Sequence, residues 1–308
     1  MSAIRYFRIL SLGAAVLACG AKVALATEFA STVVNDNLGN SATIDPGYQN
    51  VSAAVTAPTG YTGTDFGFPS VVTPFNPVFD YDQLVVIGQG GSIELQFPTT
   101  VTPSSGLDIG VFTNVGLDDN DFPSGVATNP ATLFSSPNSA VVQVSENGTK
   151  WVALNGGNPI SMTIPTDFYS NNASLTTTPS DEVTIPSGVV DANFGEPFAG
   201  TLNDFNGEDY AQIESTLGGS AGGTWLSLGG TGLSGVNFIE FQVPDDGSSQ
   251  LGLAAVSVND LPSVVVTVPV QPSTVPLPSA FWSGLTCLGG LMFVVCRSSR
   301  RRGGAVAE

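Results

Sequence analysis

Short β-branched and aromatic runs, each closed by Gly, Pro, Asn or Asp, fill residues 27–261 and constrain the fold of this chain more than any other feature. The clearest run is Ser92–Phe97, in which Ile93, Leu95 and Phe97 alternate with polar residues. Such alternation places one face of a strand in a core and the other toward solvent. No stretch of this body has a sustained helical period. The pattern predicts an all-β fold, an antiparallel β-sandwich in one large domain.

Turn residues separate the other predicted strands. These strands are Leu84–Ile87, Asp108–Phe112, Ala140–Val144, Trp151–Leu154, Trp225–Leu228, Val236–Val243 and Leu253–Val258. Asn147-Gly148 is a dipeptide that tight hairpin turns favour, so it predicts a hairpin between Ala140–Val144 and Trp151–Leu154. The glycines from Gly88 to Gly91 predict a further turn that leads into Ser92–Phe97.

The charge distribution removes whole classes of function. Lys150 is the single basic residue of the body, which holds all but one of the 26 Asp and Glu residues. Binding of nucleic acid requires a basic surface, so no nucleic-acid partner is expected. The chain has no His, and Cys19, Cys287 and Cys296 all lie outside the body. Ser-His-Asp catalysis, Cys-His catalysis and the usual zinc sites are therefore removed, and we expect no enzyme.

The N-terminus has the features of a secretory signal. Arg5 and Arg8 precede an apolar run that ends at Cys19, and Ala24-Leu25-Ala26 supplies small residues for signal peptidase. Cleavage after Ala26 is expected, which makes residues 1–26 a signal peptide. A lipoprotein signal, in which Cys19 is acylated, is the alternative.

The C-terminus has three parts that together predict a membrane-held tail. Residues 275–278 form an extended motif, because proline fixes φ and lacks a backbone N–H; they are Val275, Pro276, Leu277 and Pro278. Residues 279–296 carry no charge and are long enough for a transmembrane helix. A basic cluster at 297–302 would hold that end in the cytoplasm; it consists of Arg297, Arg300, Arg301 and Arg302. Residues 262–274 form a Pro-containing linker, residues 303–308 form a short tail, and the body must face outward.

This order of motif, helix and basic cluster resembles the PEP-CTERM sorting signal of exported bacterial proteins, with Leu277 where the commoner motif has Glu. The resemblance implies that the protein is held in the inner membrane and cleaved near the motif by an exosortase-type enzyme. Release to the cell surface or extracellular matrix would follow. A plain C-terminal membrane anchor is the alternative, and it also places the body outside.

The body resembles exported proteins with a galactose-binding-like jelly roll that carry the same kind of tail. The segments that carry the resemblance are Val71–Pro77, Val85–Phe97, Ile109–Leu117, Val142–Leu154, Gly218–Leu228, Phe238–Asp246 and Leu253–Asp260. The resemblance implies a jelly-roll-like sandwich, and it implies that a structural calcium can lie near one rim.

Two acidic loops are the candidate calcium sites. The candidate ligands are Asp118, Asp119 and Asp121 in the first loop and Asp204, Asn206 and Asp209 in the second. Calcium takes about six to eight oxygen ligands, often from such loops and from backbone carbonyls. Neither loop has the EF-hand spacing, and a solvated acidic loop is the alternative interpretation of each.

Aromatic side chains in loops could form a platform for a sugar ring. Tyr169 and Tyr210 are flanked by polar loop residues, so we expect them to be exposed and make them the carbohydrate candidates. Trp151 and Trp225 begin predicted strands, and we expect them to pack in the core.

The sequence therefore predicts an exported cell-surface or extracellular-matrix protein with a structural or adhesive role. One alternative is a module that binds exopolysaccharide with the help of calcium. A third, which the missing His disfavours, is a glycoside hydrolase that uses two carboxylates on either side of the scissile bond.

Overall fold

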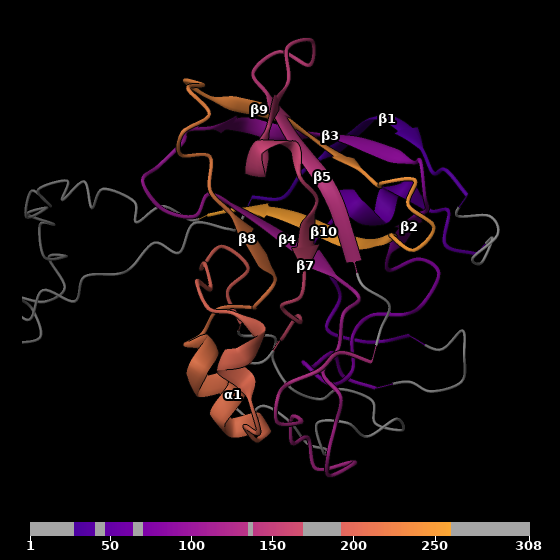
Figure 1. Cartoon of the computed structure of the whole chain (residues 1–308), viewed down its shortest axis with the longest axis vertical. Coiled ribbons are helices and arrows are strands. Elements are labelled where there is room, and N and C mark those ends of the chain that lie inside the picture. Colours follow the sequence, from indigo (N-terminus) through magenta and orange to yellow (C-terminus); the bar gives the residue numbers. More distant parts are fainter. Residues whose placement is uncertain (1–27, 41–46, 64–69, 135–137, 169–191, 260–308) are drawn as a thin grey trace, which may run out of the picture. The chain divides into compact units, whose positions relative to one another are not determined.

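The computed structural model describes residues 28–40, 47–63, 70–134, 138–168 and 192–259 (Figure 1). Every described residue belongs to one compact unit, which lies within residues 1–261. The predicted signal peptide, linker, sorting motif, membrane helix, basic cluster and tail all lie outside the described residues. Among the described residues, no helix is both long and apolar enough to span a membrane.

Two antiparallel sheets form the described body, as the sequence predicted. The larger has the order β1 (Thr32–Asn37), β3 (Ser92–Val101), β9 (Val236–Gln242), β5 (Asn138–Ser145) and β6 (Val152–Ala153), with β7 (Ile160–Met162) also paired to β5. The smaller has the order β2 (Val85–Ile87), β10 (Leu251–Val258), β4 (Ile109–Thr113) and β8 (Thr224–Leu226). In Figure 1 the larger sheet lies above the smaller one.

The main hydrophobic core lies between the two sheets. Ile93, Leu95 and Phe97 of β3 are buried there, whereas the polar residues between them are half-buried on the outer face. The opposing sheet contributes the alternate residues of its own strands, such as Val85 and Val111. Period-two alternation thus decides which side of β3 faces the core, as expected for a sandwich.

Each strand predicted from the sequence is present, with ends that differ by a few residues. The Asn147-Gly148 hairpin is confirmed, because β5 and β6 pair antiparallel across it. The turn at Gly88–Gly91 does not form a hairpin, because the strands before and after it, β2 and β3, belong to different sheets. Gly91 N–H donates to the Gly88 carbonyl at 3.0 Å, and the chain crosses there from the smaller sheet to the larger one.

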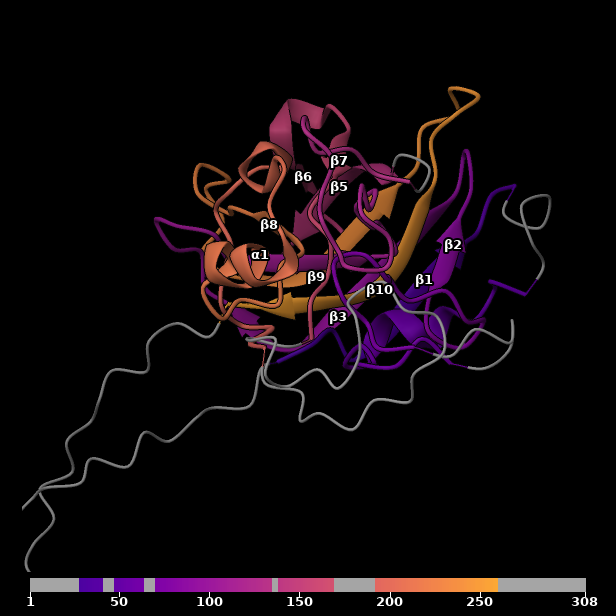
Figure 2. The same ribbon diagram turned by 90° about the horizontal axis from the view of Figure 1, so that it is seen from below.

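The smaller sheet is buried on both faces. All five residues of β4 are buried, and only the last residue of β10 is not. On the face away from the larger sheet, the ring of Phe112 lies 4.9 Å from that of Phe194 and 6.4 Å from that of Trp225. Long connecting segments and the single α-helix of the described residues, α1 (Tyr210–Leu217), lie on this side of the smaller sheet (Figures 1 and 2). Double burial explains why β4 and β10 read as nearly continuous apolar runs.

Three 3₁₀ turns complete the described secondary structure. They are η2 (Val51–Val55), η3 (Leu154–Gly157) and η5 (Leu202–Phe205).

The sequence did not predict helix α1, because two turns are too short to show a sustained period. Asp209 caps its N-terminus in a capping box with Gln212, and Gly218 in the left-handed conformation ends it. Tyr210, Ile213 and Leu217 form its apolar stripe and pack in a hydrophobic cluster that is separate from the main core.

Candidate functional site

The two predicted acidic loops lie side by side, joined by the segment 126–131. Ala127 N–H donates to the Glu208 carbonyl at 2.9 Å, and Gly207 N–H donates to the Thr128 carbonyl at 3.0 Å. The two loops belong to segments about eighty residues apart, and only the tertiary structure brings them together.

In the first loop, carboxylates bind groups of the same loop. Asp119 accepts the N–H groups of Asp121, Gly125 and Val126 at 2.9 to 3.0 Å. Asp118 accepts the hydroxyl of Thr132 at 2.5 Å. These bonds close the loop on itself, so the dense acidic run also serves as a set of backbone caps.

The second loop uses its oxygens in the same way. Asp204 accepts Thr201 N–H at 2.6 Å, and Asp209 accepts Gln212 N–H at 2.9 Å at the start of α1. The side-chain oxygen of Asn206 accepts Ala131 N–H at 2.7 Å and ties this loop to the segment beside the first. Within the part of the chain that the structure describes, no three His, Cys, Asp or Glu side chains gather as a metal-binding group.

The expectation that Tyr210 is exposed is wrong. Its side chain is 3 % exposed, because Tyr210 begins the apolar stripe of α1. Its hydroxyl donates to Asp167 Oδ1 at 3.1 Å. Burial raises the pKa of this hydroxyl far above its usual range, and the Asp167 and Glu214 carboxyls raise it further. A buried ring cannot stack on a sugar, whereas Tyr169, the other carbohydrate candidate, lies outside the described residues.

Both Trp predictions concern core packing. Trp225 is buried as predicted, and its indole N–H donates to the Gly222 carbonyl at 2.9 Å. Trp151, directly before β6, is only half-buried and belongs to none of the hydrophobic clusters of the described residues, so its predicted place in the core is not confirmed.

Two exposed aromatic side chains were not considered in the sequence prediction. Phe122 is 62 % exposed and Phe134 is 55 % exposed, and both belong to the loop that follows β4. Phe122 follows Asp121 directly in the acidic run. The sequence contains one indication of this exposure. Phe122 lies between an acidic run and Pro123, and loops of that composition lie at the surface and rarely contribute to a core.

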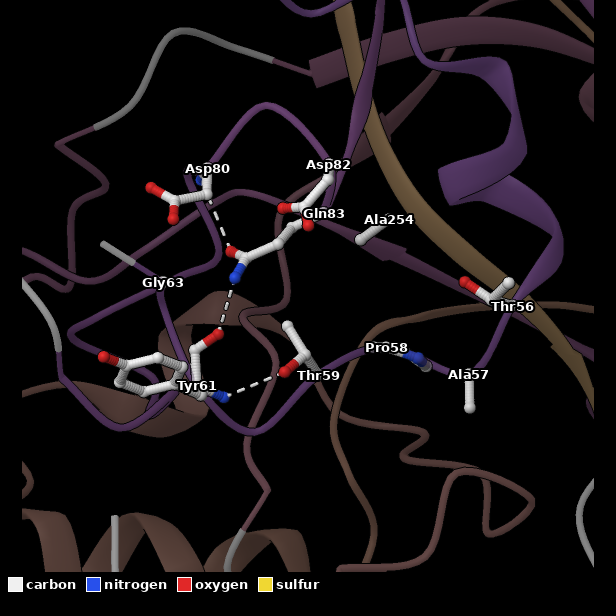
Figure 3. Close-up of a pocket in the computed structure, with 10 residues that line it drawn as sticks. All are labelled: Thr56, Ala57, Pro58, Thr59, Tyr61, Gly63, Asp80, Asp82, Gln83 and Ala254. Atoms are coloured by element: carbon white, nitrogen blue, oxygen red, sulfur yellow. Dashed lines mark hydrogen bonds between the residues drawn. The ribbon is translucent and has the colours of Figure 1, made fainter. Parts of the chain in front are cut away.

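A pocket of about 370 Å³ lies where the chain leaves η2 and passes the turn before β2 (Figure 3). Its lining residues are Thr56, Ala57, Pro58, Thr59, Tyr61, Gly63, Asp80, Asp82, Gln83 and Ala254. The sequence prediction did not include it. Asp80-Tyr81-Asp82-Gln83, a polar turn directly before an apolar strand, was the one available signal.

Gln83 organises one wall of this pocket. Its side-chain nitrogen donates to the Tyr61 carbonyl at 2.7 Å, and its side-chain oxygen accepts Asp80 N–H at 3.3 Å (Figure 3). Gly63 is required beside them, because a Cβ there would lie 1.5 Å from Asp80 Oδ2 and because its φ is +88°.

The chemistry of the pocket is that of hydroxyl, amide and carboxylate oxygens. Asp80 is 3 % exposed, Asp82 is exposed, and no basic side chain lines the cavity. Such a lining suits a neutral polyhydroxylated ligand or a cation, and it repels an anion.

The fold defines the class of this protein as an all-β sandwich of two antiparallel sheets. No protein-family model matches the chain, and no curated protein is similar to it in sequence.

Proposed function

We propose that this chain is an exported cell-surface or extracellular-matrix protein with a structural or adhesive role. The proposal rests on the order of the parts: a signal and a sorting tail, both predicted from the sequence, flank a body that folds as a β-sandwich. The body supports a passive role, because its acidic loops use their side chains to hold their own backbone. Signal peptidase and an exosortase-type enzyme would be its processing partners, and the inner membrane would hold it until cleavage.

The proposed fold of the body is a galactose-binding-like jelly roll. Its support is that strands consecutive in the chain mostly lie in opposite sheets. The strands alternate between the sheets from β1 to β5 and again from β7 to β10, whereas β5, β6 and β7 all belong to the larger sheet. Alternation of this kind is what a jelly roll of two packed sheets requires.

Cell fractionation tests the proposed processing in a bacterium that has an exosortase-type enzyme. Antibody against the body should find the wild-type protein outside the inner membrane and shortened at its C-terminus. Replacing Pro276 and Pro278 with Ala should leave it uncleaved in the membrane, whereas Pro272→Ala in the linker should have no effect. Cytoplasmic retention of the wild type, or cleavage that ignores the motif, would reject the proposal.

Calcium-assisted binding of exopolysaccharide is the second candidate function, and the polar pocket of Figure 3 is the observation that favours it. The body, residues 27–261, would be titrated with matrix polysaccharide fractions in calcium and then in chelator. Saturable binding lost in Asp82→Asn but kept in Asp121→Asn would assign it to the pocket. Binding that is lost in Asp121→Asn and on chelation, but kept in Asp82→Asn, would assign it to the acidic loops. Absence of binding in both conditions would leave the passive surface protein.

A further inference from the structure

Three Asn-Gly dipeptides lie in the described residues, and they begin at Asn147, Asn155 and Asn206. An asparagine before glycine is chemically labile, because the next backbone nitrogen can attack the side-chain amide carbon without obstruction from a Cβ. The attack requires the asparagine side chain to rotate toward that nitrogen while the local backbone opens. The fold should therefore rank the three sites by how firmly it holds each of them.

Asn147 is held firmly in the β5–β6 hairpin. Its side-chain oxygen accepts the N–H and hydroxyl of Thr149 at 3.0 and 2.7 Å and the N–H of Lys150 at 3.1 Å. The nitrogen that would attack, Gly148 N, donates its hydrogen to Ser145 Oγ at 3.0 Å. Both reacting groups must therefore lose hydrogen bonds before they can meet.

Asn206 is held in a similar way between the two acidic loops. Its side-chain oxygen accepts Ala131 N–H at 2.7 Å, and Gly207 N–H donates to the Thr128 carbonyl at 3.0 Å. Rotation of this side chain would break the contact that joins the two segments.

Asn155 is held least. It is exposed in η3, its side-chain oxygen accepts no hydrogen bond from the described residues, and its NH₂ reaches the Asn158 and Pro159 carbonyls only at 3.5 and 3.4 Å. The backbone carbonyl of Asn155 accepts the N–H and the side-chain NH₂ of Asn158 at 3.2 and 3.0 Å, but these bonds hold neither the side-chain amide nor the nitrogen that would attack it. Its φ of +49° is the single positive φ of a non-glycine residue in the described part, a left-handed turn conformation that Asn adopts more readily than other residues with a Cβ. The turn follows β6, a strand of two residues, so its opening disturbs few strand-pairing bonds.

We propose that Asn155 is a site of spontaneous deamidation in the folded protein. Gly156 N attacks Asn155 Cγ, a new C–N bond forms, and the bond from Cγ to the side-chain nitrogen breaks. The proton of Gly156 N leaves with that nitrogen as ammonia, and a cyclic succinimide remains. Water then opens the ring at either carbonyl and leaves aspartate or isoaspartate at position 155. No enzyme is needed, and water is the only other reactant.

The product adds a carboxylate to a body in which Lys150 is the single basic residue. Isoaspartate also lengthens the backbone by one carbon within a tight turn beside the edge strand β6. In a protein that persists outside the cell, the modified fraction would increase with the age of the molecule.

Peptide mapping of the full-length protein, purified in detergent and incubated in mildly alkaline buffer, tests this proposal. Mass spectrometry measures the gain of one dalton at each site, and labelling by an isoaspartyl methyltransferase measures isoaspartate. Asn155 should react at least about tenfold faster than Asn147 or Asn206, because each retained hydrogen bond slows the attack several-fold. Equal rates at the three sites, or a faster reaction at Asn147 or Asn206, would overturn the proposal.

Two controls separate the effect of the fold from that of the local sequence. In urea the three rates should converge, and persistence of the same ranking there would overturn the proposal. Ser145→Ala removes the acceptor of Gly148 N–H, so deamidation at Asn147 should become about fivefold faster. An unchanged rate at Asn147 would show that these hydrogen bonds do not control the reaction and would also overturn it. Asn155→Gln should abolish the isoaspartate label in that peptide.

Discussion

Replacing Asp108 with Ala should destabilise the smaller sheet strongly. Asp108 directly precedes β4 and is 2 % exposed. One carboxyl oxygen accepts Ser104 N–H at 2.8 Å, and the other accepts Leu228 N–H at 2.7 Å. The side chain thereby joins the loop before β4 to the chain that follows β8.

The magnitude follows from the two N–H groups that the substitution leaves without an acceptor. An unsatisfied N–H group costs about 1–3 kcal/mol when it is buried, and Ser104 is only half-buried, so the free energy of unfolding should fall by about 2–5 kcal/mol, below the sum for two buried groups. In a domain of this size about 1 kcal/mol corresponds to roughly 2–4 °C, so Tm should fall by roughly 4–20 °C. Asp108→Asn keeps one acceptor and should lose about half as much free energy.

Urea and thermal unfolding of the body, followed by circular dichroism, measure these changes. Asp245→Ala is the matched control, because Asp245 is exposed in the loop between β9 and β10. If Asp108→Ala shifts the urea midpoint no more than Asp245→Ala, the carboxylate does not join the two segments and the reasoning fails.

Three further changes test the core and two titrating groups. Phe112→Ala removes a fully buried ring that contacts Phe194 and Trp225, so the free energy of unfolding should fall by about 3–5 kcal/mol in urea titrations. The pKa of Tyr210 is raised in the folded state, so its contribution is complete below about pH 10 and is lost as the pH rises above that value. Tyr210→Phe should therefore weaken the alkaline loss of stability. Hydrogen bonds from Ser249 and Ser248 lower the pKa of Asp246 to about 2, so its contribution is present above its ordinary pKa of 3.8 and is lost as the pH falls through about 2. Asp246→Asn should flatten the acid dependence of the urea midpoint over that range.

Each of these three predictions has an outcome that would contradict it. A loss in Phe112→Ala no greater than that in Phe122→Ala, which alters an exposed side chain, would refute tight packing of Phe112 against Phe194 and Trp225. An alkaline profile of Tyr210→Phe identical to that of the wild type would show that another group titrates there. Acid profiles that coincide for Asp246→Asn and the wild type would refute the role of the Asp246 carboxylate.

The strands could be predicted from the sequence because alternation acts locally. Ile93, Leu95 and Phe97 point to one side of β3 whatever the strand pairs with, and Asn147-Gly148 favours a tight turn by its own backbone preferences. The all-β class, the hairpin and the burial of Trp225 follow from such local rules. Helix α1 escaped prediction because eight residues contain too few turns to show a period.

The site residues depended on contacts that no local rule supplies. Tyr210 was expected to be exposed because its neighbours are polar, yet its position at the start of α1 directs its ring into a core. Asp119, Asp204 and Asp209 carry carboxylates, which are common calcium ligands. In the structure their oxygens accept hydrogen bonds from backbone N–H groups nearby in the chain. The sequence could not indicate this second use, because the same carboxylate serves either purpose.

The sequence by itself therefore determined the strand pattern, the excess of negative charge, and the absence of histidine and body cysteine that removes much catalytic chemistry. The tertiary structure alone decided which sheet each strand joins, that the smaller sheet is covered on both faces, and that the acidic loops lie together. It also decided that Tyr61, Asp82 and Gln83 line one pocket. The physical reason is that pleat and turn preferences act within a few residues. Burial and hydrogen-bond pairing instead depend on contacts between segments far apart in the chain, such as those of Asp108 and Leu228.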